Sequence, residues 1–265
     1  MLSISQSKWM QIGSPTSRVQ FEIEDRDRFL RIDGRRAYHL GYGGCQTCSF
    51  LFERLSGANQ AVQIEETAEA LRTGLNSLDE DVVQVIGRGL PENVYCTILA
   101  ESPLTRVQPG DENDYFMKEQ IALWGLDTFW CLPHDPRVPY FRAGDLDLGD
   151  SKHFFNFVAP MMPTEWLKMS AIEEYKEALR TKASGTAVAV AVLDVRGPAV
   201  YTSDPIPVPD EHWCLTHYLL DGHHKLNAAS ETGKPLRLLS FISASLGVCT
   251  RADIEIVVGL MQLTP

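Results

Sequence analysis

Apolar and polar residues alternate in several short segments of the chain, and in others the apolar residues recur at helical spacing. Residues 19–24 (VQFEIE) and 28–33 (RFLRID) flank a short charged connection, which predicts a hairpin near the N-terminus. Further apolar runs predict strands at 82–86, 94–99, 153–158, 186–195, 199–202, 212–220, 236–243 and 253–259. The remaining periodic segments predict helices at 49–55, 64–73, 115–124, 171–180 and 223–232.

Strands and helices alternate only in part along the chain, which predicts an α+β fold with a mixed sheet. We expect residues 1–150 to form an N-terminal α+β domain that contains a Cys-x-x-Cys motif and aromatic-rich loops. Residues 151–265 would form a second, more regular domain, in which the Pro-rich segment 203–211 is an extended loop. The large aromatic side chains of the first domain's loops are expected to be buried in a folded cluster, namely Trp124, Phe129, Trp130, Tyr140 and Phe141.

Composition and charge narrow the class of protein. The chain has 265 residues, 44% of them hydrophobic, which is ample for a packed core and excludes wholesale disorder. No apolar run approaches the ~20 residues that span a bilayer, so no membrane partner is expected. The net charge of −11 argues against a nucleic-acid partner. The start of the chain has no secretory pattern, so we expect a cytoplasmic protein; no oligomeric state is predicted.

The segment Asp221-Gly222-His223-His224-Lys225 lies where a predicted strand turns into a predicted helix. The first backbone N–H groups of a helix have no internal partner, and the helix dipole leaves partial positive charge there. Two imidazoles and an ammonium on the first turn add hydrogen-bond donors, and glycine allows close backbone approach. The segment therefore predicts a site for phosphate or another oxyanion. The alternative is purely structural: Asp221 only caps the helix, and the two histidines are ordinary surface residues.

The segment 218–242 (YLLDGHHKLNAASETGKPLRLLSFI) resembles the signature of the ParB/sulfiredoxin-like superfamily. In that family a strand ends in a Gly-His-Arg or Asp-Gly-His-His-Arg element, which an alanine-rich helix, a glycine and another strand follow. Upstream, a strand leading to Pro160 and Pro163, the helix at 171–180 and the strand at 186–195 also fit. The resemblance covers roughly residues 153–243. It implies that the domain 151–265 is a nucleotide-binding domain.

The resemblance also implies roles for individual residues. Gly222, His223, His224 and Lys225 would bind the phosphates of ATP or ADP, with Lys225 in place of the family's usual arginine. Sulfiredoxins carry a catalytic cysteine where this chain has His223, and partition proteins carry basic motifs that this chain lacks. The nearest branch is that of the free-serine kinases, which share the Asp-Gly-His-His element.

Phosphoryl transfer needs a base and usually Mg²⁺. The candidate catalytic residues are Asp221, His223 and Glu211; for these roles Asp221 is the main candidate, and Glu211 and His217 are weaker ones. The main hypothesis is a nucleotide-dependent phosphotransferase acting on a small polar substrate. Two alternatives stay open: a protein that senses a nucleotide or metabolite without catalysis, and a phosphodiester hydrolase.

Cys45 and Cys48 form a Cys-x-x-Cys motif at the start of the helix predicted at 49–55. A thiol at a helix N-terminus is acidified, which is typical of dithiol redox motifs. A Zn²⁺ site would need two more ligands, which His39, Cys96 or Cys131 could supply only through the fold. Redox chemistry, a zinc site and inert packing all remain open for this pair.

Overall fold

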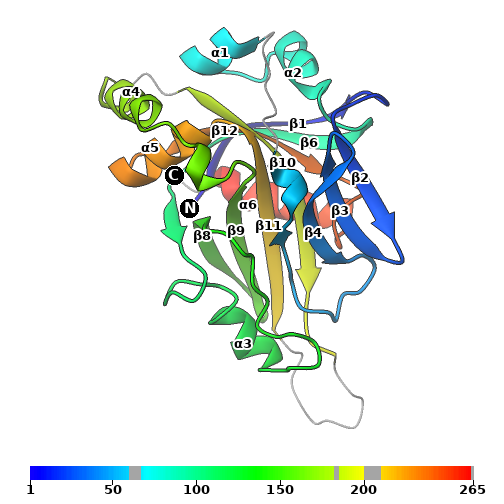
Figure 1. Cartoon of the computed structure of the whole chain (residues 1–265). Helices are drawn as coiled ribbons and strands as arrows, with labels where there is room; N and C mark the ends of the chain where they lie inside the picture. Colours follow the sequence, from blue (N-terminus) through cyan, green and yellow to red (C-terminus); the bar gives the residue numbers. More distant parts are fainter. Residues whose placement is uncertain (60–66, 182–184, 200–209, 264–265) are drawn as a thin grey trace.

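An eight-stranded mixed sheet forms the centre of the protein (Figure 1). The structure is a computed structural model, and it describes residues 1–59, 67–181, 185–199 and 210–263. Strand β10 is parallel to β12 and β11 is parallel to β9, whereas the other neighbours are antiparallel. The predicted α+β class is therefore confirmed. In spatial order the strands are β1 (Ser3–Ile12), β6 (Asn93–Ser102), β12 (Leu236–Ser243), β10 (Thr186–Arg196), β11 (Glu211–Asp221), β9 (Lys152–Pro160), β8 (Tyr140–Gly149) and β7 (Thr105–Val107).

A second, four-stranded sheet covers one face of the large sheet. Its strands are β2 (Val19–Glu24), β3 (Asp27–Ile32), β4 (Arg35–Tyr42) and β5 (Glu53–Arg54). Leu30 and Tyr38 of this sheet share a core with Val190 and Phe241 of the large sheet. The pattern of β10 explains this arrangement, because its valines and alanines alternate between the two faces.

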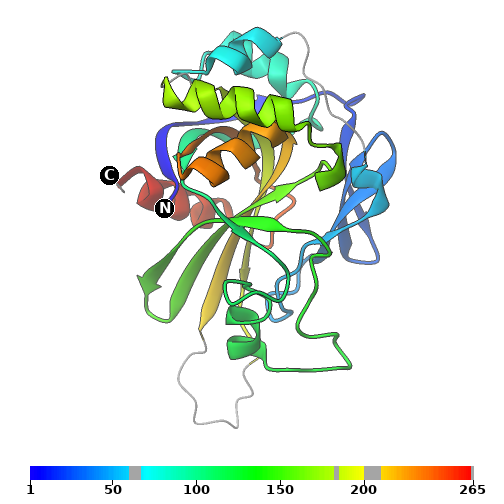
Figure 2. The same ribbon diagram turned by 60° about the vertical axis from the view of Figure 1, so that its left-hand side comes forward.

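Helices cover the opposite face and one end of the large sheet. Helices α5 (His223–Thr232) and α6 (Arg251–Leu263) pack on the face that carries the alanines of β10. Helices α1 (Ala68–Thr73), α2 (Glu80–Gly87) and α4 (Met169–Arg180) gather at one end, and Figure 2 shows α4 lying beside α5. Helix α3 (Glu119–Trp124) lies at the other end (Figure 1). Among the described residues, no helix is both long and apolar enough to cross a membrane.

The position expected to separate two domains, residue 150, lies in the turn between β8 and β9. These two strands pair with each other within the large sheet. Strands β1, β6, β7 and β8 precede the turn and the other four follow it. The two parts of the chain therefore share one sheet and the cores on both of its faces.

Most of the predicted elements are confirmed. They are the hairpin at 19–33, the strands at 94–99, 153–158, 186–195, 212–220 and 236–243, and the helices at 171–180 and 223–232. The helices predicted at 64–73 and 115–124 are confirmed over Ala68–Thr73 and Glu119–Trp124. The strand at 199–202 and the loop at 203–211 fall mainly on residues 200–209, outside the described part of the chain.

Three predictions of local structure are wrong. The segments 82–86 and 253–259, predicted as strands, lie in helices α2 and α6. The helix predicted at 49–55 is instead extended chain with the short strand β5, and Phe50 and Phe52 are buried there. Side chains two residues apart lie on the same side of an extended chain, so burial of both phenylalanines favours this conformation over a helix.

Candidate functional site

The strand–turn–helix predicted around residue 222 is present. Strand β11 ends at Asp221, Gly222 is the N-cap with a φ of 97°, and α5 starts at His223. A Cβ atom on Gly222 would lie 2.6 Å from the Cβ of Ala187 in β10, so only glycine fits this turn. No side chain caps the helix, which excludes the simple interpretation of Asp221 as an N-cap.

The side chain of His223 is directed into the protein. His223 is buried, and its Nε2 accepts hydrogen bonds from the backbone N–H groups of Met161 and Met162, each at 3.0 Å. Burial lowers the pKa of His223 to about 3, so the imidazole is neutral near pH 7. The cavity beside His223 and Asn227 holds about 10 Å³, which is room for one water molecule rather than a phosphate. His223 therefore fixes the chain that follows β9.

Lys225 is also committed to internal contacts. Its buried Nζ donates hydrogen bonds to the carbonyl oxygens of Leu71, at 3.1 Å, and Thr186, at 2.8 Å. Burial lowers the pKa of Lys225, and the carboxylate of Asp221, 3.8 Å from Nζ, opposes that effect. The ammonium thus joins α1, β10 and α5, which is a different use from the phosphate contact that the sequence predicts.

The groups that remain available at this turn are backbone amides, His224 and Asp221. The first intrahelical hydrogen bond of α5 runs from Leu226 N–H to Gly222 O, at 2.8 Å. None of the three preceding N–H groups, those of His223, His224 and Lys225, donates to another group in the described part of the chain. Three amides of the first helical turn therefore have no acceptor among the described residues, and an oxyanion site uses such amides.

The side chains of His224 and Asp221 are half-buried at the same turn. Nε2 of His224 accepts the backbone N–H of Lys168 at 3.1 Å, which leaves Nδ1 to carry the proton of the neutral ring. Burial, and then the charge of Lys168, lower the pKa of His224. Nδ1–H of His224 is therefore a neutral hydrogen-bond donor next to the helix N-terminus.

Two other candidate residues lie away from the turn. Glu211 begins β11 and Asp221 ends it, so about 33 Å of strand separates their backbones. The carboxylate of Glu211 accepts the indole N–H of Trp213 at 3.1 Å. His217 is buried in the middle of β11, where Nδ1 lies 2.7 Å from the hydroxyl of Ser240. The structure therefore does not bring Glu211 or His217 to the turn at Asp221.

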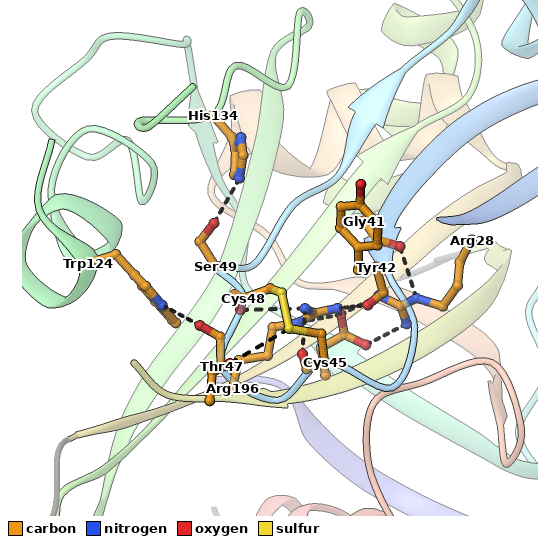
Figure 3. The surroundings of a disulfide bond; sticks show 11 residues. Arg28, Gly41, Tyr42, Cys45, Thr47, Cys48, Ser49, Trp124, His134 and Arg196 are labelled. Carbon is orange, nitrogen blue, oxygen red and sulfur yellow. Dashed lines mark hydrogen bonds and ion pairs between the residues drawn. A yellow bond between two sulfur atoms is a disulfide. The ribbon is translucent and has the colours of Figure 1, made fainter. Parts of the chain in front are cut away.

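Cys45 and Cys48 form a second candidate site, and the structure joins them by a disulfide (Figure 3). They lie in the loop between β4 and β5, so the predicted helix start, and with it the acidifying helix dipole, is absent there. Disulfide sulfurs are not thiolate ligands. Within the ranges that the structure describes, no group of three or more His, Cys, Asp or Glu side chains could hold a metal ion.

A buried ion cluster, which was not predicted from the sequence, supports this loop. Arg196 in β10 donates hydrogen bonds to the carbonyl oxygens of Tyr42, Cys45 and Cys48, at 2.8, 3.0 and 3.4 Å. It also pairs with Asp194, which pairs in turn with Arg28. Burial raises the pKa of Asp194, but Arg196 and Arg28 outweigh it and lower the pKa to about 2. Asp194 and Arg196, at the end of an otherwise apolar strand, were the sequence feature that could have indicated this cluster.

The aromatic loops near the disulfide are only partly a folded cluster. Tyr140 and Phe141 are buried, as predicted, but Phe129 is 80% exposed and Trp130 is 63% exposed. Trp124 contacts the disulfide loop through a hydrogen bond from its indole N–H to Thr47 O, at 3.3 Å.

Comparison of the chain with known proteins gives no match to a family model, a curated protein or a solved structure.

Proposed function

We propose that this chain is a ParB/sulfiredoxin-like protein that binds the phosphate groups of a nucleotide, ATP or ADP, at the N-terminus of α5. The observation that carries the proposal is the set of three unpaired backbone N–H groups on the first turn of this helix. The order of β9, α4, β10, β11, the glycine turn, α5 and β12 is also the order that the resemblance implies. A helix N-terminus of this kind attracts phosphate through hydrogen bonds and through the helix dipole.

The residues of the turn have different roles in this proposal from those expected from the sequence. The amides and Nδ1–H of His224 bind the phosphate. His223 and Lys225 keep their internal partners and fix the shape of the turn. The exposed Lys168, whose charge acts on His224, adds positive potential at the same place.

Phosphoryl transfer to a small polar substrate is a second candidate function, and the half-exposed carboxylate of Asp221 favours it. Asp221 would accept the proton of a substrate hydroxyl or hold Mg²⁺ through water, and Mg²⁺ would neutralise phosphate charge. With Glu211 at the far end of β11, Asp221 is the one carboxylate among the candidate residues at the turn. Nucleotide binding is therefore better supported than phosphoryl transfer. We expect the protein in the cytoplasm.

Incubation of the purified chain with labelled ATP or ADP, with and without Mg²⁺, tests both functions. Saturable binding supports the nucleotide site, and Mg²⁺-dependent turnover that Asp221→Asn abolishes supports phosphoryl transfer. Glu211→Gln is the matched control, because this carboxylate lies at the other end of the same strand and should affect neither. Absence of binding for both nucleotides would contradict the proposal.

A further inference from the structure

The loop that carries the disulfide is held in place by contacts that do not involve sulfur. All four carbonyl oxygens of residues 45–48 accept a hydrogen bond from outside the loop. Arg196 binds those of Cys45 and Cys48, the Gly197 N–H binds that of residue 46, and Trp124 binds that of Thr47. The backbone of the loop should therefore keep its shape when the disulfide opens.

We propose that Cys45 and Cys48 form a reversible thiol–disulfide exchange site that reacts with low-molecular-weight thiols and their disulfides. The two residues are half-buried, so small molecules can reach them, and their Cα atoms are 5.6 Å apart. Because the loop is fixed, the reduced sulfurs stay within reach of each other. An ordered dithiol re-forms its disulfide with a smaller loss of chain entropy than a flexible one.

The charge around the loop favours thiolate, which is the reactive form of cysteine. Arg28, Arg196 and Asp194 form a buried cluster with a net charge of +1, and the guanidinium of Arg196 lies against the backbone of both cysteines. His134, which contacts Ser49 at 2.8 Å, is neutral near pH 7, because burial lowers its pKa to about 4. The cluster therefore places one net positive charge beside the backbone of Cys45 and Cys48.

The other cysteines of the chain differ from this pair in burial or in pairing, although Cys214 and Cys249 also lie near the charged cluster. Burial raises the pKa of Cys96 to about 11 and that of Cys249 to about 12, and it raises the pKa of Cys214 further. Cys131 is exposed and unpaired. These four are therefore the natural internal comparison for the proposed pair.

The exchange has two steps. The thiolate of a small thiol attacks one sulfur of the pair, which breaks the internal S–S bond, forms a mixed disulfide and releases the other cysteine as a thiolate. A second small thiolate then attacks the small molecule's sulfur in the mixed disulfide. This step releases the remaining protein cysteine as a thiolate and yields the small-molecule disulfide and the reduced pair. Two electrons pass to the protein, and the released thiolates take up protons from water. The reverse reaction, with the small-molecule disulfide as oxidant, restores the Cys45–Cys48 bond.

The test is equilibration of the purified chain in buffers of varied reduced-to-oxidised glutathione ratio, followed by maleimide trapping and intact mass measurement. We expect two thiols to appear together in one transition. The transition should be lost in Cys45→Ser and kept in Cys131→Ser, with an unchanged far-UV circular dichroism spectrum in both redox states. A thiol count that is independent of the ratio, or unfolding on reduction, would overturn the proposal.

Two further measurements separate this proposal from its competitors. In the reduced Cys131→Ser chain, iodoacetamide alkylation should be half-maximal at a pH below the ordinary cysteine value of about 8.5. Half-maximal alkylation at or above that pH would contradict the electrostatic argument. Stoichiometric zinc in the reduced chain, lost in Cys45→Ser, would overturn the exchange site in favour of a metal site.

Discussion

Arg28 in β3 donates two hydrogen bonds to the carboxylate of Asp194 in β10, at 2.8 and 2.7 Å, and both side chains are almost fully buried. This ion pair links the small sheet to the large one. The backbone N–H of Val248 and the guanidinium of Arg196 also bind Asp194. One carboxylate therefore connects segments from the start, the middle and the end of the chain.

Asp194→Asn should lower the free energy of unfolding by about 3–5 kcal/mol, because it leaves two buried guanidinium groups without a counter-charge. Chemical denaturation of the variant and the parent measures this loss. Asp33→Asn is the matched control, since the pair of Asp33 with Arg18 is largely exposed and should cost less than about 1 kcal/mol. Similar losses for the two variants would mean that the buried cluster does not stabilise the fold.

Gly222→Ala should destabilise the protein by about 2–4 kcal/mol. The added methyl group meets Ala187, and the positive φ adds strain for any residue other than glycine. Gly233→Ala, at the other end of α5, provides the comparison, because its φ is 64° and nothing lies within 4 Å of the added Cβ. It should cost only the backbone strain, about 1–2 kcal/mol. Equal costs from thermal denaturation would show that the turn is not tightly packed against β10.

The protein should lose stability as the pH falls from about 6.5 towards 4. A buried histidine whose pKa is lowered binds its proton more readily in the unfolded chain, so falling pH through that interval favours unfolding. Burial lowers the pKa of His217 and of His223 to about 3. It lowers the pKa of His134 and of His212 to about 4.

Denaturation at pH 7, 6, 5 and 4.5 measures this dependence, and one buried histidine contributes a slope of at most about 1.4 kcal/mol per pH unit. His217→Gln should therefore reduce the slope, whatever its effect on stability at pH 7. A variant with the slope of the parent would mean that His217 is protonated in the folded protein.

Replacement of both disulfide cysteines, Cys45→Ser with Cys48→Ser, should leave nucleotide affinity unchanged. The disulfide loop lies at the C-terminal end of β10, beside Arg196, whereas the turn at Asp221 pairs with Val188 near the other end. About 26 Å of strand separates the two places. Calorimetry on the double variant checks this independence, and an altered affinity would show that the two sites are coupled.

Sequence periodicity predicted most of the regular strands correctly. It failed at two segments where a capping residue starts a helix. The β-branched run at 82–86 favours a strand, but the carboxylate of Asp79 accepts the N–H of Val82 and starts α2. At α6, Thr250 and Asp253 exchange side-chain and backbone hydrogen bonds in the same way. Both caps are legible in the sequence, as an acidic or hydroxyl residue just before the apolar run.

The local shape of the turn at Gly222 could be predicted, because strand, glycine and helix follow one another in the sequence. The partners of its side chains could not. Lys225 binds the carbonyl of Leu71, 154 residues away, and His223 binds amides 61 and 62 residues away. Such contacts depend on how the whole sheet is assembled, and no local pattern encodes them. The burial of His223 and Lys225 therefore could not be predicted from the sequence.

The most direct test of the nucleotide site is calorimetric titration of the full chain with ATP, for the parent and for His224→Glu. We expect saturable binding of one ATP per chain. Affinity should fall at least tenfold when a carboxylate faces the amides of α5, and His153→Glu, at the start of β9, should bind like the parent. Absence of binding in the parent, or equal affinity in His224→Glu, would contradict the proposed nucleotide site.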